Sequence, residues 1–173
     1  KLYLKQKADW EALATETELK DVIGKLKQVD NELTTVKKVV KVLTHGSCNQ
    51  VFMSESNTGN GVYQISVGNN QVINAYCQMS SISGCSGGGW TLVMKINGAS
   101  SAFGYDSSLW TSTRTYNDYS YGRDGGLDNR QFKGSTYWKT SFKEICVGMR
   151  YNGRFRAFSF SYPASSLYSL IAD

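Results

Sequence analysis

Proline and histidine are almost absent from this chain, which has one of each (Pro163 and His45) among its 173 residues. The four cysteines include no CxxC pair, and a single histidine cannot complete the usual ligand sets of structural zinc, so we expect no zinc site. No apolar run approaches the roughly 20 residues that a membrane-spanning helix needs, so we expect no membrane span in this segment. Hydrophobic residues still make up 40% of the sequence, enough for one ordinary domain with an appendage.

The cysteines all lie in the second part of the chain, where charge thins and Gly, Ser, Asn and aromatic residues become frequent: Cys48, Cys77, Cys85 and Cys146. An even number of cysteines in such a β-type sequence favours disulfides and an oxidising compartment. Four reduced core cysteines in a cytosolic protein are the alternative. Residues 1–5 have neither the apolar core nor the cleavage site of a signal peptide. We therefore expect a secreted, extracellular protein of which this sequence is a processed product or a fragment.

An unbroken heptad pattern runs through residues 19–43, a segment without proline. The apolar spacing alternates three and four, which is the a/d pattern of a coiled coil. We predict a helical oligomerisation stalk over residues 1–46, with these core positions: Leu19, Val22, Leu26, Val29, Leu33, Val36, Val40 and Leu43. The alternative is a single amphipathic helix docked on its own domain. A basic membrane-surface helix is disfavoured because acidic residues alternate with the basic ones.

The core residues of the stalk also indicate how many helices associate. Leucine occupies the first three a positions and valine the first three d positions, whereas parallel dimers prefer β-branched a and leucine d residues. In a parallel bundle the g position of one heptad faces the e position of the next, which pairs Lys25 with Asp30 and Glu32 with Lys37. Both pairs have opposite charges. The sequence therefore predicts a parallel trimer or tetramer.

The hydrophobic period changes to that of β-strands after Cys48. We predict strands over residues 62–67, 72–76, 90–96, 145–150 and 154–160, and a helix that starts at Ser165-Ser166 and continues over residues 167–171. Asn152-Gly153 between the last two strands is typical of a two-residue hairpin turn. These elements predict an α+β fold that is rich in antiparallel strands.

Four blocks carry a resemblance to a known family: Ser47-Cys48, Gly61-Val62-Tyr63-Gln64-Ile65, Ala75-Tyr76-Cys77-Gln78-Met79 and Gly87-Gly88-Gly89-Trp90-Thr91-Leu92-Val93. In order and spacing they resemble the opening of a fibrinogen C-terminal-like domain, the group that includes intelectins. Residues 125–128 and 142–149 are more similar to its divergent invertebrate members. The resemblance implies that residues 47–173 form the N-terminal part of such a domain, incomplete at its C-terminus, behind a coiled-coil helix.

The resemblance implies an extracellular, disulfide-bonded, non-enzymatic protein that binds acetylated sugars, other glycans or protein termini, usually with calcium. It implies Cys48–Cys77 as the first disulfide of the domain, with Cys85–Cys146 as the remaining pair. An intermolecular bond through Cys48 is the alternative. The calcium loop and main ligand pocket of the family lie in its C-terminal half. We therefore assign no cofactor, metal ligand or ligand-binding residue within this segment.

The stretch Gly84-Cys85-Ser86-Gly87-Gly88 matches the G-x-S-x-G pattern of the nucleophile elbow in hydrolases. The elbow needs a strand before it, a helix after it and a histidine downstream. Here a strand follows, and His45 lies upstream. We interpret the match as a Gly/Ser turn and predict no catalytic residue and no enzymatic activity.

A Gly-rich loop carries acidic and amide residues that could offer oxygen ligands to calcium: Asp118, Asp124, Asp128 and Asn129. Their spacing fits no EF-hand, so ordinary turn residues are the preferred interpretation. Trp90, Trp110 and Trp138 could stack on sugars, although aromatic side chains of this size usually belong to the core.

Basic residues exceed acidic ones over residues 130–156, where Glu144 alone opposes this set: Arg130, Lys133, Lys139, Lys143, Arg150, Arg154 and Arg156. Excess positive charge favours anionic partners. For an extracellular protein these are sulfated glycans, anionic matrix or mineral-associated acidic proteins rather than nucleic acid. Strand alternation can scatter these residues over both faces of a sheet, however, and a solvated surface is the preferred interpretation.

Together these features predict multivalent, lectin-like recognition of glycans or matrix, with weak single sites repeated on one stalk. The alternative is a structural extracellular-matrix component, such as one of a mineralised skeletal matrix.

Overall fold

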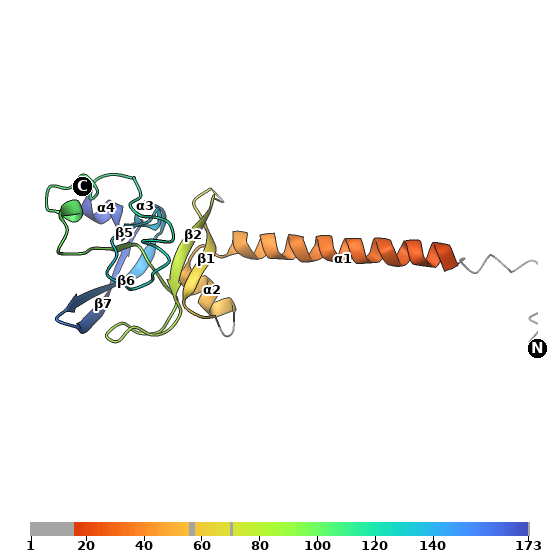
Figure 1. Cartoon of the computed structure of the whole chain (residues 1–173), viewed down its shortest axis with the longest axis horizontal. Coiled ribbons are helices and arrows are strands. Elements are labelled where there is room, and N and C mark those ends of the chain that lie inside the picture. Colours follow the sequence, from red (N-terminus) through yellow and green to blue (C-terminus); the bar gives the residue numbers. More distant parts are fainter. Residues whose placement is uncertain (1–15, 56–57, 70, 173) are drawn as a thin grey trace, which may run out of the picture. The chain divides into compact units, whose positions relative to one another are not determined.

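The computed structural model describes residues 16–55, 58–69 and 71–172, apart from the side chains of residues 41–44. The chain divides into two compact units, Lys1–Lys41 and Val42–Asp173. Helices and antiparallel sheets occur together, so the predicted α+β class is confirmed (Figure 1). No helix within the described ranges is long and apolar enough to cross a membrane.

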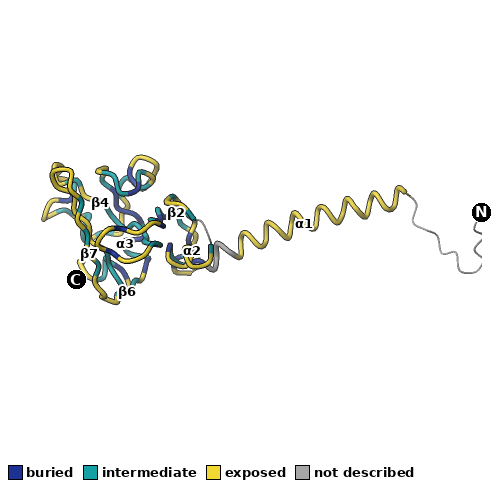
Figure 2. Tube along the Cα trace, turned by 90° about the horizontal axis from the view of Figure 1, so that it is seen from below, coloured by how far each residue is buried: buried dark blue, intermediate teal, exposed yellow. Residues whose placement is uncertain are grey.

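The helix α1 (Glu16–Thr44) contains 29 residues and covers the predicted heptads. All residues from 16 to 40 are exposed, as the yellow trace in Figure 2 shows. The a-position side chain of Leu26 is 63% exposed. The side chain of Leu43, the last predicted core residue, lies outside the described part. The helix is thus confirmed over residues 16–44, whereas residues 1–15 of the predicted stalk lie outside the described part, and association with other copies stays a prediction.

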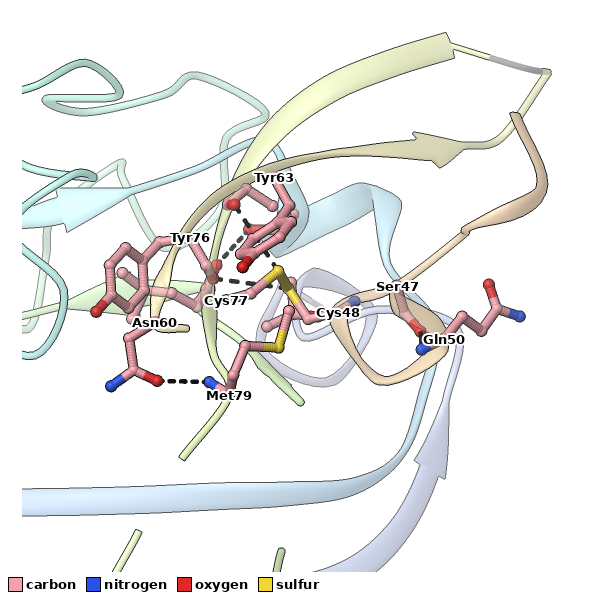
Figure 3. Close-up of a disulfide and its surroundings, with 12 residues drawn as sticks. Ser47, Cys48, Gln50, Asn60, Tyr63, Tyr76, Cys77 and Met79 are labelled. Atoms are coloured by element: carbon pink, nitrogen blue, oxygen red, sulfur yellow. Dashed lines mark hydrogen bonds between the residues drawn. A yellow bond between two sulfur atoms is a disulfide. The ribbon is translucent and has the colours of Figure 1, made fainter. Parts of the chain in front are cut away.

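The second unit opens with α2 (Cys48–Ser54), a helix that the sequence analysis did not predict. Seven residues are too few to show a helical period, and the start signal is a single residue. Ser47 caps the helix, because its Oγ accepts a hydrogen bond from the Gln50 N–H at 3.3 Å. The disulfide Cys48–Cys77, one of the two expected pairs, joins α2 to the sheet behind it (Figure 3).

Strands β1 (Gly61–Val67) and β2 (Gln71–Gln78) form an antiparallel pair, and the short strand β3 (Trp90–Thr91) extends it to three strands. Alternate side chains of β1 and β2 point toward α2. The core that results consists of Cys48, Val51, Ile65, Val67, Ala75, Cys77 and Met79. This cluster combines a disulfide with aliphatic burial, so α2, β1 and β2 form one layered structure.

The single strand predicted over residues 90–96 is wrong: the structure divides it into β3 and β4 (Met94–Lys95). The Leu92 N–H still donates to the Tyr76 carbonyl of β2 at 2.9 Å, but the Leu92 carbonyl accepts from the Thr136 hydroxyl. The chain then changes partner, and β4 pairs with β5 (Phe132–Lys133). The Leu92 carbonyl is therefore taken up by a side chain from a distant segment and does not continue the sheet. No local sequence pattern could predict this break in the strand.

Strands β6 (Phe142–Tyr151) and β7 (Arg154–Ala164) form the predicted hairpin as a separate two-stranded sheet. Asn152 and Gly153 have φ values of 45° and 72°, which is the left-handed geometry that an Asn-Gly turn supplies. The turn extends away from β1 and β2 (Figure 1). The hairpin is longer than predicted, because β6 begins at residue 142 rather than 145 and β7 ends at residue 164 rather than 160.

The second disulfide, Cys85–Cys146, joins β6 to the loop before β3 and is the other expected pair. The loop lies directly on the hairpin at Gly84, where a Cβ atom would fall 1.8 Å from the Ala157 carbonyl oxygen. A residue with a side chain could not occupy this position without displacing the backbone. The disulfide and this close approach together attach the hairpin to the rest of the domain.

The remaining helical turns are η1 (Ser101–Phe103), α3 (Thr136–Lys139) and α4 (Tyr168–Ile171). In α3, Tyr137 is fully buried and meets the Tyr168 ring edge to face at 6.2 Å. The predicted serine-led start of the last helix is close to that observed. The helix α4 begins at residue 168, and the Ser166 hydroxyl accepts from the Ser169 N–H at 3.0 Å.

Candidate functional site

The segment between β4 and β5 folds around an open polar recess of about 350 Å³. Its walls are the side chains of Asn97, Tyr116, Asn117, Tyr121, Asn129, Arg130 and Gln131. Four of these are amides, two are phenols and one is a guanidinium, so every lining residue can form hydrogen bonds. None of the three tryptophans considered above belongs to this lining. The sequence analysis assigned no ligand-binding residue and did not find this set.

Backbone pairing closes the base of the recess. Tyr116 and Lys133 exchange two N–H to carbonyl hydrogen bonds, each at 2.8 Å. The next residue, Asn117, has a left-handed φ of 51°, and its amide N–H donates to the Gln131 carbonyl at 3.1 Å. The two ends of the long loop are thereby held together, and Asn117 and Gln131 are placed side by side.

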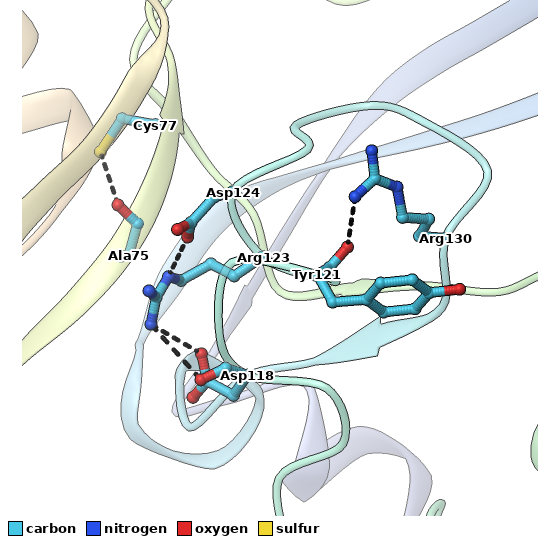
Figure 4. A network of polar contacts seen from close by, with 7 residues as sticks. All are labelled: Ala75, Cys77, Asp118, Tyr121, Arg123, Asp124 and Arg130. Carbon is cyan, nitrogen blue, oxygen red and sulfur yellow. Dashed lines mark hydrogen bonds and ion pairs between the residues drawn. The ribbon is translucent and has the colours of Figure 1, made fainter.

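Arg130 is held in place at the recess by three contacts. Its Nε forms an ion pair with the Asp128 carboxylate at 2.8 Å. A terminal N–H group donates to the Tyr121 carbonyl at 3.2 Å, the bond drawn in Figure 4. Its guanidinium also lies 5.4 Å from the centre of the Tyr121 ring. Asp128 in turn accepts from the ammonium group of Lys95, whose side chain is only 8% exposed. Asp128 thus holds Arg130 while also pairing with Lys95, one carboxylate between two cations, and the Tyr121 ring is fixed against the guanidinium.

Acidic residues considered as calcium ligands instead form ion pairs. Arg123 bonds the Asp118 carboxylate at 3.3 Å and the Asp124 carboxylate at 2.7 Å, as Figure 4 shows. Asp128 is shared between Lys95 and Arg130. No group of three or more metal-ligating side chains occurs in the part of the chain that the structure describes. Asp118, Asp124 and Asp128 thus each form an ion pair with a basic side chain in the folded domain.

Two of these carboxyl groups have opposite pKa shifts. Burial raises the pKa of Asp118, and the nearby Arg123 charge offsets this only in part. Burial also acts to raise the pKa of Asp128, but hydrogen bonds from Lys95 and from the Arg130 N–H, together with both positive charges, outweigh it and lower the pKa. Compared with an unfolded aspartate, the folded loop thus makes Asp128 harder to protonate and Asp118 easier to protonate.

We expect these shifts to shape the acid dependence of the free energy of unfolding. The contribution of Asp128 is complete above the pKa of an unfolded aspartate, about 4, and is lost as the pH falls through the lower folded-state value. Asp118 acts oppositely, since its folded form binds a proton first as the pH falls toward about 4. In urea titrations from neutral pH to pH 3, Asp128→Asn will flatten the decline below about pH 4. Asp118→Asn will remove the rise in the free energy of unfolding that Asp118 contributes as the pH falls toward about 4. An unchanged decline at acid pH in Asp128→Asn would contradict this assignment.

One lining side chain has an unused acceptor. The Oε1 atom of Gln131 is buried and has no hydrogen-bond partner among the described residues. Buried amide oxygens are nearly always paired in folded proteins, and each exception needs an explanation. This oxygen is itself closed off from solvent, so it is not one of the groups that the recess presents. The recess offers amide groups and two aromatic rings, a set suited to binding a polar molecule.

The structure also brings together a serine and a histidine that the sequence analysis did not pair. The Oγ atom of Ser54 lies 2.8 Å from Nε2 of His45. The same hydroxyl also lies within hydrogen-bond distance of the Val51 carbonyl, at 3.1 Å, one helical turn earlier. Ser86 of the G-x-S-x-G match lies elsewhere, next to the Cys85–Cys146 disulfide.

The basic residues of the last third do not form one patch. Lys133 is fully buried, and its ammonium group donates to the carbonyls of Leu109 and Ser112 and lies 4.4 Å from the centre of the Tyr137 ring. Burial, with a smaller effect of the Arg114 charge, lowers the pKa of Lys133. Four of the others are exposed and belong to the hairpin: Lys143, Arg150, Arg154 and Arg156. The positive charge is thus divided between the core, the recess and the hairpin.

The three tryptophans are half-buried structural residues. The indole N–H of Trp110 donates to the Gly104 carbonyl at 2.9 Å, and that of Trp90 donates to the Ser86 carbonyl at 3.2 Å. Trp138 lies beside the buried Lys133, at 5.8 Å. Each ring therefore has a role within the fold, and Tyr116 and Tyr121 are the aromatic residues at the recess.

The chain matches no protein-family model and no curated protein. A functional assignment therefore depends on the chemistry of the recess, on the exposed heptad face of α1 and on the two disulfides.

Proposed function

We propose that this is a lectin-like extracellular recognition protein, in which a parallel trimer or tetramer formed by α1 presents several copies of a glycan-binding recess. The observation that carries the proposal is the recess itself, where four amides and two tyrosines surround a polar hollow. The sequence resemblance to fibrinogen C-terminal-like domains supports the same function. The two disulfides are compatible with secretion.

The chemistry of the lining suits a neutral sugar. Amide groups both donate and accept hydrogen bonds, as sugar hydroxyls do, and an aromatic ring can cover an apolar sugar face. Arg130 is held by the Asp128 carboxylate and the Tyr121 carbonyl, so its guanidinium is directed to groups of the protein rather than to a ligand. We therefore propose an uncharged glycan as the ligand class of this site.

The exposed face of α1 supports the multivalent part of the proposal. Leu26 and its heptad equivalents present an apolar stripe along a helix whose described side chains are all exposed. In a parallel bundle these side chains would be buried together, and Lys25 would meet Asp30 of a neighbouring helix. An open recess of this size binds weakly by itself. Several copies on one stalk would raise the apparent affinity for a dense glycan surface without any new contact.

We expect Tyr121→Ala and Asn129→Ala each to lower binding of the full chain to an immobilised glycan array by about tenfold, since each removes a ring or a hydrogen-bonding group from the recess. Tyr105→Ala and Asn74→Ala are matched controls, because both residues are exposed and neither lines the recess. Sedimentation equilibrium on each variant checks that the oligomeric state is unchanged. Equal losses in the control and recess variants, or no glycan binding by the wild type, would refute the proposal.

A further inference from the structure

The two faces of the β6–β7 hairpin differ in composition. In the antiparallel register Ile145 faces Phe160 and Val147 faces Phe158, and side chains of directly paired residues lie on the same side of a sheet. We call this side the outer face, and its members are Ile145, Val147, Met149, Tyr151, Arg154, Arg156, Phe158 and Phe160. The opposite side carries Cys146 and Ala157, the residues that attach the hairpin to the loop at Gly84. Attachment on one side leaves the outer face uncovered.

The outer face exposes an unusual amount of apolar surface. Met149 is 73% exposed, Tyr151 74% and Phe158 59%. Phe158 and Phe160 stack on each other with ring centres 5.9 Å apart, so their rings form one continuous surface. Contiguous exposed patches of this kind mark interaction sites in soluble proteins. The outer face is therefore a surface on which a partner is expected.

The outer face carries positive charge, which favours some kinds of partner over others. Arg156 is paired with Met149 and Arg154 with Tyr151, next to the turn. Within residues 142–164, all of them described, the one acidic residue is Glu144, and its pairing with Ser161 places it on the opposite face. Two outer faces packed together would both carry positive charge and no acidic residue, which disfavours a second copy of the chain as the occupant. The partner is therefore anionic, and it must also cover apolar side chains.

We propose that the outer face docks on the surface of an anionic lipid bilayer. Apolar side chains such as Phe158 and Met149 would enter the boundary between headgroups and acyl chains, while Arg154 and Arg156 contact lipid phosphates. A sulfated polysaccharide would satisfy the arginines but would leave the apolar side chains in water. The hairpin lies on the surface without spanning the bilayer. This interaction is separate from the recess, whose lining residues belong to the segment before β6.

The test is co-flotation of the full chain with vesicles of phosphatidylcholine that contain one-fifth phosphatidylserine, alongside vesicles of phosphatidylcholine alone. We expect binding to the anionic vesicles only. Arg154→Gln with Arg156→Gln, and separately Met149→Ser with Phe158→Ser, will each weaken it by about tenfold. Arg114→Gln and Tyr105→Ser are matched controls, since both residues are exposed and lie outside the hairpin. Near-ultraviolet circular dichroism checks that each variant keeps the native fold.

Each other outcome would overturn the proposal. Absence of vesicle binding, or equal binding to neutral and anionic vesicles, contradicts the charge argument. Loss of binding in the arginine variant but not in the Met149/Phe158 variant shows that apolar contact is not involved. Binding to immobilised heparin that depends on Arg154 and Arg156, without vesicle binding, would make the outer face a polysaccharide site instead.

Discussion

Replacement of Leu26 by aspartate will leave the protein monomeric and lower its apparent affinity for a dense glycan surface by about 10²–10⁴-fold. Leu26 occupies an a position in the middle of α1 and is 63% exposed in the single helix. In a parallel bundle the same position of every copy would meet at the axis. Each aspartate would lose water there without a partner, which outweighs the apolar gain of the neighbouring layers. Val29→Asn at the next d position will weaken the assembly for the same reason.

Sedimentation equilibrium on the full chain measures the change in mass, and binding to a glycan-coated surface measures the change in affinity. Asn31→Asp is the matched control, because it adds the same charge at the outward f position of the same helix. A wild-type protein that stays monomeric at high micromolar concentration would disprove the coiled-coil assignment. A Leu26→Asp variant that still sediments as a trimer or tetramer would show that the core lies elsewhere.

Removal of the Cys85–Cys146 disulfide by a double replacement with serine will lower the free energy of unfolding by about 3–4 kcal/mol. The two cysteines are 61 residues apart, so the bond restricts a long loop in the unfolded chain. In the folded domain it attaches β6 to the loop that contacts Ala157 through Gly84. Hydrogen exchange in β6 and β7 should therefore increase more than the global loss of stability requires.

Urea denaturation gives the loss of stability, and hydrogen exchange by mass spectrometry locates it. The variant in which Cys48 and Cys77 are both replaced by serine is the matched comparison. It also removes one disulfide, with a separation of 29 residues, but that bond lies in the core beneath β1 and β2. Its exchange should increase in α2 and β2 rather than in the hairpin. Equal exchange patterns in the two variants would show that the bonds do not act on separate parts of the domain.

Local signals in the sequence were sufficient for the elements that repeat a pattern. The heptads predicted α1, alternation predicted β1 and β2, and Asn152-Gly153 predicted the turn of the last hairpin. In each case neighbouring residues carry the information, because the period or the turn geometry is set within a few positions. The Cys48–Cys77 pair came from the resemblance, with Cys85–Cys146 as the pair that remained, and both agree with the structure.

The recess could not be found in the same way, because long-range contacts create it. Asn97 follows β4, while Asn129 and Gln131 precede β5, and only the pairing of these two strands brings them together. The left-handed backbone at Asn117 depends on its bond to the Gln131 carbonyl, a distant residue. The burial of Lys133 was likewise not predictable from its neighbours in the sequence, because lysine side chains are usually exposed. Its ammonium group can be buried because the carbonyls of Leu109 and Ser112, in a remote loop, accept its hydrogen bonds.

The exposure of α1 along its length has a consequence for the lifetime of the protein. A helix whose described side chains are all exposed derives its order from intrinsic propensity, and valine at successive d positions lowers that propensity. In the assembly that we propose, association would supply the missing free energy, and helix formation and copy number would be linked by mass action. Dilution would then dissociate and unwind α1 together, and trypsin-like proteases could cleave the unwound chain at exposed lysines such as Lys27 and Lys37. Molecules released from the proposed glycan surface into solution would thus be cleared faster than those that stay assembled on it.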